Sequence, residues 1–200
     1  MATERVTDRS VLRFAEEVKG RFSFLETLGL HCVRSEASFV RFESPRISIN
    51  VYHGRRSFEI GLEVESTLSP TDSYSFSEIL RLVDREQGEQ YRNYATHTAQ
   101  GVAEGVGKLA ELFQRCVAVG ILNDEQLFSR LKLQREELAR KYALETQLVQ
   151  ARRKSEAAWH RKDYATVVRV LKPLRAALSA TEIGKLEFAE KETRHPGNRS

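Results

Sequence analysis

Residues 33–65 read VRSEASFVRFESPRISINVYHGRRSFEIGLEVE, and apolar and polar residues alternate in two runs within this stretch. A period of two is typical of strands that bury one side and expose the other. The two runs therefore predict neighbouring strands of a half-buried sheet. Their apolar members are Ile47, Ile49 and Val51 in the first run and Phe58, Ile60, Leu62 and Val64 in the second.

The links between the runs predict an antiparallel meander. The segment His53-Gly54-Arg55-Arg56 joins the two runs, and Gly54 can adopt the positive φ that a tight reversal needs. Two weaker runs, Phe39–Glu43 and residues 30–34, precede them, with a proline-containing link at 44–46. Because such a sheet needs a cover on its apolar side, we predict an α+β fold with about four antiparallel strands covered by helices.

Helical periodicity flanks the predicted sheet on both sides. Apolar residues recur at three- and four-residue spacing in residues 10–19 and again in 75–85. Ser75 and Glu78 have the spacing of a capping box, which places the start of the second helix. The segment Gln87-Gly88-Glu89 is expected to break the helical pattern.

A longer helix is predicted over residues 95–119. Gly101, Gly105 and Gly107 lie in its first half, but they lack the order of a phosphate-binding loop and no strand precedes them. We therefore expect these glycines to allow another element to pack closely on the helix, at a propensity cost of about 1 kcal/mol each.

The C-terminal part is predicted to be entirely helical. One long helix could run over residues 124–162, and a second amphipathic stretch follows Asp163, with Pro173 expected to kink or open it. Ser179 and Glu182 have capping-box spacing before a last helical pattern. The sequence thus predicts an α+β domain over residues 1–122, then a helical extension or arm over 123–200 with a long helix and a C-terminal helical hairpin.

The segment AAWHRKDYA at residues 157–165 resembles one tetratricopeptide-type helical hairpin. The resemblance covers about 35 residues, and no second copy follows at the period of about 34 residues that an array requires. It implies a helical hairpin able to bind protein, without the concave groove of an array. A purely structural helix pair stays open as the alternative.

A second resemblance covers residues 10–130. It rests on the order of the predicted elements and on two short sequence segments, FSFLETLGL before the meander and SYSFSEILRLV after it. In these features the chain resembles an uncharacterised bacterial class encoded near toxin and immunity genes. The resemblance implies a partner-binding or immunity-like role and transfers no functional residue.

The residue types that carry common enzyme chemistry form no recognisable motif. The chain has no HExxH, no GxSxG and no cysteine pair with metal spacing, so we predict no catalytic residue, no metal and no cofactor. Cys32 and Cys116 are expected to be reduced and buried. An enzymatic function stays possible if folding brings distant residues such as Tyr52, His53 and Glu63 together in one pocket.

The positive charge is concentrated in the C-terminal part. Residues 1–122 carry 15 basic and 17 acidic side chains, a balance of −2, whereas residues 123–200 carry 17 and 11, a balance of +6. The densest basic cluster, Arg152-Arg153-Lys154, is suited to nucleic-acid phosphates or to an acidic protein, although interspersed glutamates are also common on solvated helices. No apolar run reaches the roughly 18 residues of a membrane span, and the first residues lack a secretory signal, so we predict a cytoplasmic protein that does not enter membranes.

The leading functional prediction is a non-catalytic protein-binding module, such as an immunity or adaptor protein that acts by stoichiometric binding. The alternative is a nucleic-acid-associated protein that uses the basic C-terminal helices. A homodimer through the 124–162 helix stays open, although its apolar residues form no sustained heptad. The predicted partner-binding residues are Arg41, Tyr52, Arg55, Arg56, Glu59, Glu63, Arg152, Arg153, Lys154 and Trp159.

Overall fold

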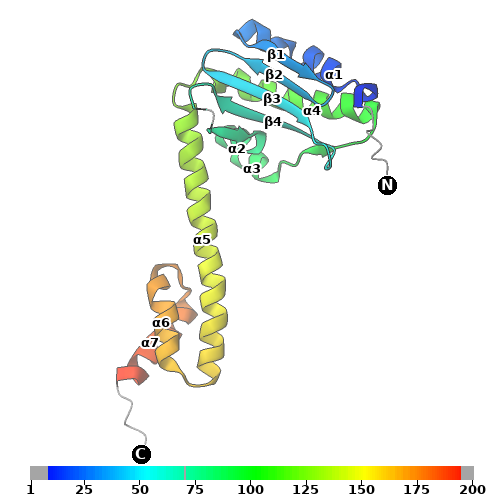
Figure 1. Cartoon of the computed structure of the whole chain (residues 1–200). Helices are drawn as coiled ribbons and strands as arrows, with labels where there is room; N and C mark the ends of the chain where they lie inside the picture. The colour runs from blue at the N-terminus through cyan, green and yellow to red at the C-terminus, as the bar shows by residue number, and fades with distance from the viewer. Residues whose placement is uncertain (1–8, 70, 195–200) are drawn as a thin grey trace, which may run out of the picture. The chain divides into compact units, whose positions relative to one another are not determined.

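The computed structural model of the chain describes residues 9–69 and 71–194 (Figure 1). They belong to two compact units, one ending at Arg135 and the other starting at Glu136. The boundary falls within helix α5, which runs without interruption over Leu127–His160. The predicted α+β class is confirmed. The predicted boundary after residue 122, between an α+β domain and a helical extension, stays a prediction.

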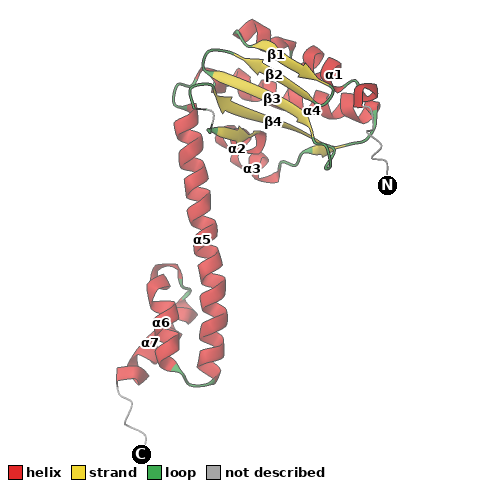
Figure 2. Ribbon diagram, in the orientation of Figure 1, coloured by secondary structure: helices red, strands yellow, loops and turns green. Residues whose placement is uncertain are grey.

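An antiparallel sheet forms one layer of the first unit (Figure 2). Its strands pair in the order β1-β2-β3-β4-β5, and β6 pairs with the remaining part of β4. The prediction of about four strands was slightly low, because β5 and β6 are too short for alternation to reveal them. The strands are β1 (His31–Glu36), β2 (Phe39–Glu43), β3 (Ile47–His53), β4 (Glu59–Ser66), β5 (Ser73–Ser75) and β6 (Tyr94–Ala95).

The β3–β4 turn is the predicted hairpin but uses a different residue for the reversal. Gly54 does not have a positive φ, whereas Phe58 does, with φ 55°. The amide of Gly54 donates to the Glu59 carbonyl at 2.8 Å, and the amide of Phe58 donates to the Gly54 carbonyl at 3.1 Å. A Cβ at Gly54 would meet only the Ser57 hydroxyl at short range, and this hydroxyl can rotate away.

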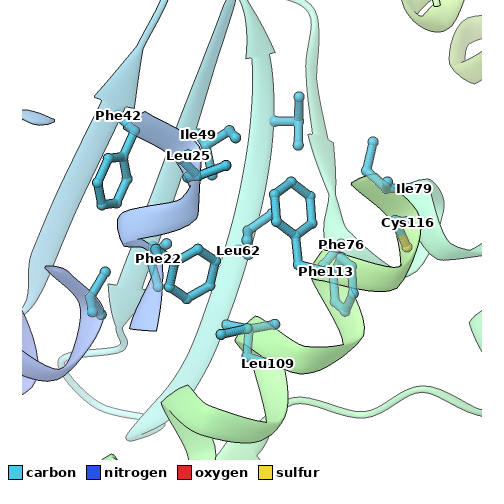
Figure 3. Close-up of a cluster of buried hydrophobic side chains, with 14 of the residues drawn as sticks. Phe22, Leu25, Phe42, Ile49, Leu62, Phe76, Ile79, Leu109, Phe113 and Cys116 are labelled. Carbon is cyan, nitrogen blue, oxygen red and sulfur yellow. The ribbon is translucent and has the colours of Figure 1, made fainter. Parts of the chain in front are cut away.

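Helices cover one side of the sheet, and none of the described helices of this unit lies on the other side (Figure 1). The helix α4 and the N-terminal helix α1 lie behind the strands in this view. Apolar side chains from both layers form the core, in which Phe22 packs against Phe42 and Phe113 (Figure 3). The α-helices that lie wholly in the described part of this unit are α1 (Phe14–Arg21), α2 (Phe76–Val83), α3 (Arg85–Gln90) and α4 (Ala99–Ala118). The first turns of α5 and the 3-10 segments Arg9–Leu12, Ser23–Leu28 and Ile121–Asn123 also belong to it.

The segment around Gly88 is helical, which corrects the predicted break at residues 87–89. Helix α3 begins after Asp84, whose carboxylate accepts the amide of Gln87 at 3.0 Å. This side-chain cap offsets the low helix propensity of Gly88. The glycine is also sterically required, because a Cβ there would lie 2.5 Å from the backbone nitrogen of Arg81.

Two of the three α4 glycines are sites of close packing, as predicted. A Cβ on Gly105 would lie 2.5 Å from Cδ1 of Tyr94 and 2.7 Å from Cδ1 of Ile60, so this glycine lets β6 and β4 approach the helix. A Cβ on Gly101 would collide with Thr96. Gly107 differs, because its nearest neighbour would be an Arg21 side chain at an ordinary 3.8 Å.

The second unit combines the C-terminal part of α5 with two shorter helices. Helix α6 (Tyr164–Leu171) passes into a 3-10 segment, Lys172–Ala177, at the predicted opening around Pro173, and α7 (Ala180–Arg194) follows. The amide of Ser179 donates to the Glu182 carboxylate at 2.7 Å, which confirms the second capping box. The unit has its own small core, made of Ala151, Ala158, Val167, Leu171, Leu186 and Ala189.

Replacing Gly105 with alanine is expected to destabilise the first unit by about 1–3 kcal/mol, because the added methyl group overlaps Tyr94 and Ile60. Gly20→Ala is the matched control: a Cβ there meets nothing within 4 Å, and the change should be neutral or slightly stabilising. Urea unfolding followed by circular dichroism measures both. Equal stability of the two variants would contradict the close-packing role.

Glu182→Gln is expected to destabilise the second unit by about 1 kcal/mol at neutral pH. The Arg152 guanidinium and the Ser179 amide lower the pKa of Glu182 to about 2, so its stabilisation is present above pH 4.5 and is lost as the pH falls toward 2. Fluorescence of Trp159, the only tryptophan, reports urea unfolding of this unit.

The control is Glu187→Gln, which removes the exposed partner of Arg175 from the same helix and should cost less. A difference between wild type and Glu182→Gln that stays constant down to about pH 2 would contradict the assignment.

Candidate functional site

The side of the sheet opposite the core carries a continuous polar surface, which we call the outer face. Strand pairing aligns its residues across the sheet: Arg41 opposes Asn50, which opposes Glu63. Alternation along each strand then assigns the remaining members. The outer face comprises Arg34, Glu36, Phe39, Arg41, Glu43, Ser48, Asn50, Tyr52, Glu59, Gly61, Glu63 and Glu65.

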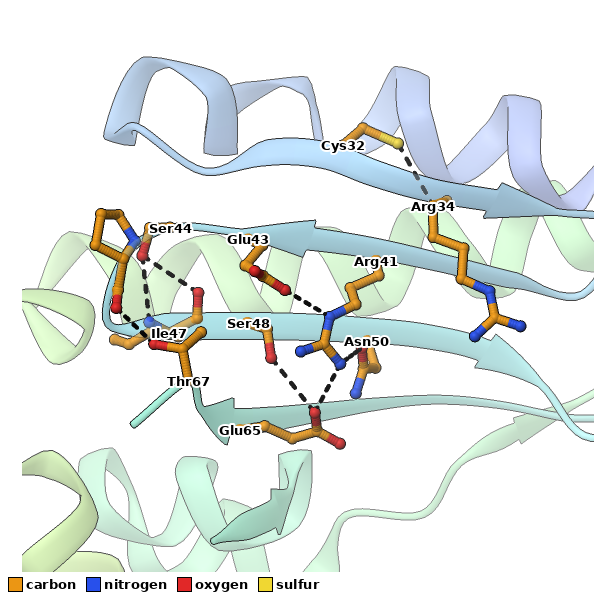
Figure 4. Close-up of polar contacts among 11 residues, drawn as sticks. Cys32, Arg34, Arg41, Glu43, Ser44, Ile47, Ser48, Asn50, Glu65 and Thr67 are labelled. Carbon is orange, nitrogen blue, oxygen red and sulfur yellow. Dashed lines mark hydrogen bonds and ion pairs between the residues drawn. The ribbon is translucent and has the colours of Figure 1, made fainter. Parts of the chain in front are cut away.

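Arg41 connects three strands on this face (Figure 4). Its Nε donates to Glu43 at 2.9 Å, and its Nη1 donates to Glu65 at 2.8 Å and to the Asn50 side-chain oxygen at 3.3 Å. Ser48 donates to the same Glu65 oxygen at 3.4 Å. The predicted contact residue Arg41 therefore lies on the expected face, but its guanidinium is already occupied by two carboxylates.

This network explains why polar residues are buried in the middle of β3. Ser48 is 0% exposed and Asn50 is 4% exposed, and both have partners in the network. In the described ranges, no fully buried side-chain nitrogen or oxygen lacks a hydrogen bond. The polar side chains at the centre of the outer face therefore satisfy one another's hydrogen bonds. Any contacts with other molecules are expected at the residues around this centre.

Tyr52 lies flat on the outer face over Gly61, its cross-strand partner. A Cβ on Gly61 would lie 2.5 Å from the Tyr52 hydroxyl oxygen, so the ring occupies the space of the missing side chain. Burial raises the pKa of Tyr52, and the carboxylates of Glu63 and Glu59 raise it further. The ring is therefore bordered by negative charge.

Glu59 and Glu63 differ from the other glutamates of the outer face because neither forms an ion pair with any residue that the structure describes. Burial raises the pKa of Glu63, and the neighbouring charge of Glu65 adds to this effect, while the Ser73 hydroxyl opposes it. With two arginines and five glutamates, the outer face has a balance of −3. Two of these three excess negative charges, Glu59 and Glu63, lie beside Tyr52, and the third lies where Glu43 and Glu65 share Arg41.

Arg55 and Arg56 lie in the β3–β4 turn, at one end of the outer face. The turn is held by Arg9, whose guanidinium donates to the carbonyls of His53, Gly54 and Arg55 at 3.0, 3.1 and 2.6 Å. Both turn arginines are exposed. The structure thus brings six predicted residues into one region, namely Arg41, Tyr52, Arg55, Arg56, Glu59 and Glu63.

The four remaining predicted residues, Arg152, Arg153, Lys154 and Trp159, belong to α5 in the second unit. Arg152 donates to Glu182 at 2.6 and 3.3 Å, so it stabilises the helix packing. Arg153 and Lys154 are exposed and form no ion pair with the described residues. The Trp159 ring lies 5.6 Å from Tyr164 and 5.5 Å from Phe188 in an aromatic cluster.

His53 does not join Tyr52 and Glu63 in a pocket, although it follows Tyr52 in β3. Its ring is turned to the core side, is 2% exposed and stacks on Phe14. Its Nε2 lies 3.1 Å from the Phe58 carbonyl and 3.0 Å from the Thr96 carbonyl, which assigns the proton to this nitrogen. His53 thus has a structural role in the hairpin.

The two cysteines differ in burial. Both cysteines are free thiols; Cys116 is buried, whereas Cys32 is only partly buried, which corrects the prediction for Cys32. Burial raises the pKa of Cys116 to about 11. Among described residues, no group of three histidine, cysteine, aspartate or glutamate side chains is placed to hold a metal ion.

Comparison with protein-family models, with curated proteins and with solved structures finds no match for this chain. The resemblances to a tetratricopeptide hairpin and to an immunity-like class therefore stay predictions. Within the part of the chain with described coordinates, no helix is both long and apolar enough to cross a membrane.

Strand periodicity placed Arg41, Tyr52, Glu59, Glu63 and Glu65 on one face, and the strand pairing agrees. It did not identify Gly61, Asn50 and Ser48 as parts of the site. A glycine inside an alternating strand was the available signal for Gly61, because it marks a close approach. The network of Arg41 has no local signal, because its partners come from three strands.

Glu63→Gln is expected to raise the free energy of unfolding at neutral pH by up to about 1 kcal/mol. The folded state raises the pKa of Glu63, so ionisation disfavours folding above that pKa, and the cost disappears as the pH falls below about 4.5. Urea unfolding across this pH range measures the difference. Glu65→Gln is the matched control with the opposite sign, because it removes an ion pair with Arg41.

Proposed function

We propose that this protein is a non-catalytic binding module that holds a protein partner through the outer face. One observation carries the proposal: Glu59 and Glu63 border the half-buried Tyr52 ring without an ion-pair partner among the described residues. Keeping Glu63 ionised costs folding free energy, since burial raises its pKa. Unfavourable charges of this kind concentrate at functional sites, where an external group compensates them.

The chemistry of this region favours a cationic partner segment. A lysine or arginine side chain can donate charge-assisted hydrogen bonds to both carboxylates while its cation lies against the Tyr52 ring. The flat ring and the surrounding polar residues provide the aromatic anchor and polar rim that protein interfaces commonly use. The partner is therefore expected to present a basic surface to the outer face.

A stoichiometric immunity or adaptor role is consistent with this mode of action, because it requires only a surface and no reacting group. The outer face supports such a role through its size: it spans β1 to β4, and no helix among the described residues of its own unit covers it. The resemblance of residues 10–130 to an immunity-like class points in the same direction.

The proposal is tested by affinity capture from the native host at moderate salt, with and without nuclease. The wild-type chain should retain a protein partner after nuclease treatment, and Glu59→Gln/Glu63→Gln should retain at least about tenfold less, since two charged hydrogen bonds are lost. Glu111→Gln is the control, because this glutamate is exposed on α4, away from the outer face. Equal retention by the double variant would contradict the proposal.

An alternative function, nucleic-acid association, is favoured by Arg153 and Lys154 in the second unit, which are exposed and form no ion pair with the described residues. Arg153→Glu/Lys154→Glu should then abolish retention of nuclease-sensitive material, and retention by the wild type should fall steeply with salt. Arg152 is left unchanged in this test, because its pairing with Glu182 stabilises the unit. Unchanged retention would rule out these two residues as the phosphate contact.

A further inference from the structure

A cleft of about 270 Å³ opens in the first unit between α4 and the segment that connects α3 to β6. Its floor is apolar: Ile60 contributes from the core side of β4, and Leu109 and Leu112 contribute from α4. We call this feature the α4–β6 cleft. It is formed by the core side of the sheet and its helical layer, whereas the proposed protein contacts lie on the outer face.

The glycine pattern of α4 shapes this cleft. Gly105 lines it, and the absence of a side chain there lets the Tyr94 ring and Ile60 approach the helix within van der Waals contact. The wall formed by β6 is therefore held close to α4 and fixes the width of the cleft. A preformed apolar floor of this kind is typical of small-molecule sites.

Unused hydrogen-bond donors lie along the rim. Tyr91 packs its ring edge-to-face on Phe76 at 5.0 Å, and its hydroxyl has no partner among the described residues. This hydroxyl is not fully buried, but burial of the residue raises the pKa of Tyr91 to about 12, so the hydroxyl is a neutral donor. The side-chain amide of Asn93 also has no partner among the described residues. The rim thus presents two neutral donors.

Two cations complete the rim. Nη1 of Arg92 donates to the carbonyls of Glu89 at 3.0 Å and Tyr91 at 2.7 Å, which leaves its other nitrogens available. Lys108 pairs with Glu104 at 2.5 Å, but an ammonium has three donors and this contact uses one. Since Glu104 is the carboxylate at this position, the two cations leave a balance of +1 beside an apolar floor.

We propose that the α4–β6 cleft binds a small amphipathic carboxylate, with its apolar body on Ile60, Leu109 and Leu112 and its carboxylate hydrogen-bonded by Lys108 and Tyr91. The volume sets the size of the ligand: a cavity of about 150 Å³ holds benzene, so 270 Å³ corresponds to a body of roughly ten heavy atoms. An aromatic ring with a short acidic side chain satisfies both the volume and the charge.

Phenylacetate is a suitable probe, and phenylethanol is its neutral counterpart. Titration of the full-length protein, followed by amide NMR spectra, should give saturable shifts confined to the cleft segments around residues 91–94 and 105–112. Phenylethanol should bind about tenfold more weakly, because it lacks the negative charge that the Lys108 ammonium binds. Absence of saturable shifts at millimolar phenylacetate would overturn the proposal.

Two variants locate the site. Leu112→Trp should fill the cleft and abolish the shifts, whereas Lys108→Met should keep the fold and reduce phenylacetate affinity about tenfold without changing that of phenylethanol. Lys19→Met, an exposed change on α1, is the charge control and should bind as the wild type does.

If Leu112→Trp does not fold, the lysine variants decide the question. Equal phenylacetate affinity in Lys108→Met and Lys19→Met would contradict the proposed carboxylate contact, as would equal affinity of wild type for the acid and the alcohol. Neither result affects the proposed function of the outer face, because Glu59 and Glu63 take no part in the cleft.

Discussion

The guanidinium of Arg41 is the interaction on which the outer half of the sheet depends. Strand β3 is buried on both sides, with aliphatic residues toward the helices and Ser48 and Asn50 toward the outer face. Polar groups at such positions are costly unless they are hydrogen-bonded. Arg41 and Glu65 supply those bonds, so the sheet can have two different buried layers while only one of them is covered by helices.

The fold was predictable where the spacing of apolar residues along the chain reflects which side of a strand or helix is buried. Alternation revealed β3 and β4 because their two sides face different environments, and capping boxes marked helix starts at Ser75 and Ser179. The prediction failed where a neighbour far along the chain overrides local preference. Gly88 is helical because it packs against Arg81 behind an Asp84 cap, and β6 has only two residues and is defined by its pairing with β4.

The candidate site was predictable to the same extent and for the same reason. Strand parity was sufficient to place Tyr52, Glu59 and Glu63 together, but it could not distinguish free charges from occupied ones. Arg41 and Arg152 look like contact residues in the sequence, and each is bound by a glutamate from another element. No sequence motif marks the α4–β6 cleft, because its walls come from separate segments and none of these segments has a recognisable ligand-binding pattern.

The shape of the outer face around Tyr52 depends on Gly61, a residue that has no side chain. The Tyr52 ring lies close to the strand because position 61 has no side chain beneath it, which gives a flat surface beside Glu59 and Glu63. Any larger residue at position 61 would lift the ring and turn a flat platform into a protrusion while every charge stayed in place. Shape and charge on this face can therefore vary independently, because the shape depends on position 61 and the charge depends on the glutamates around it.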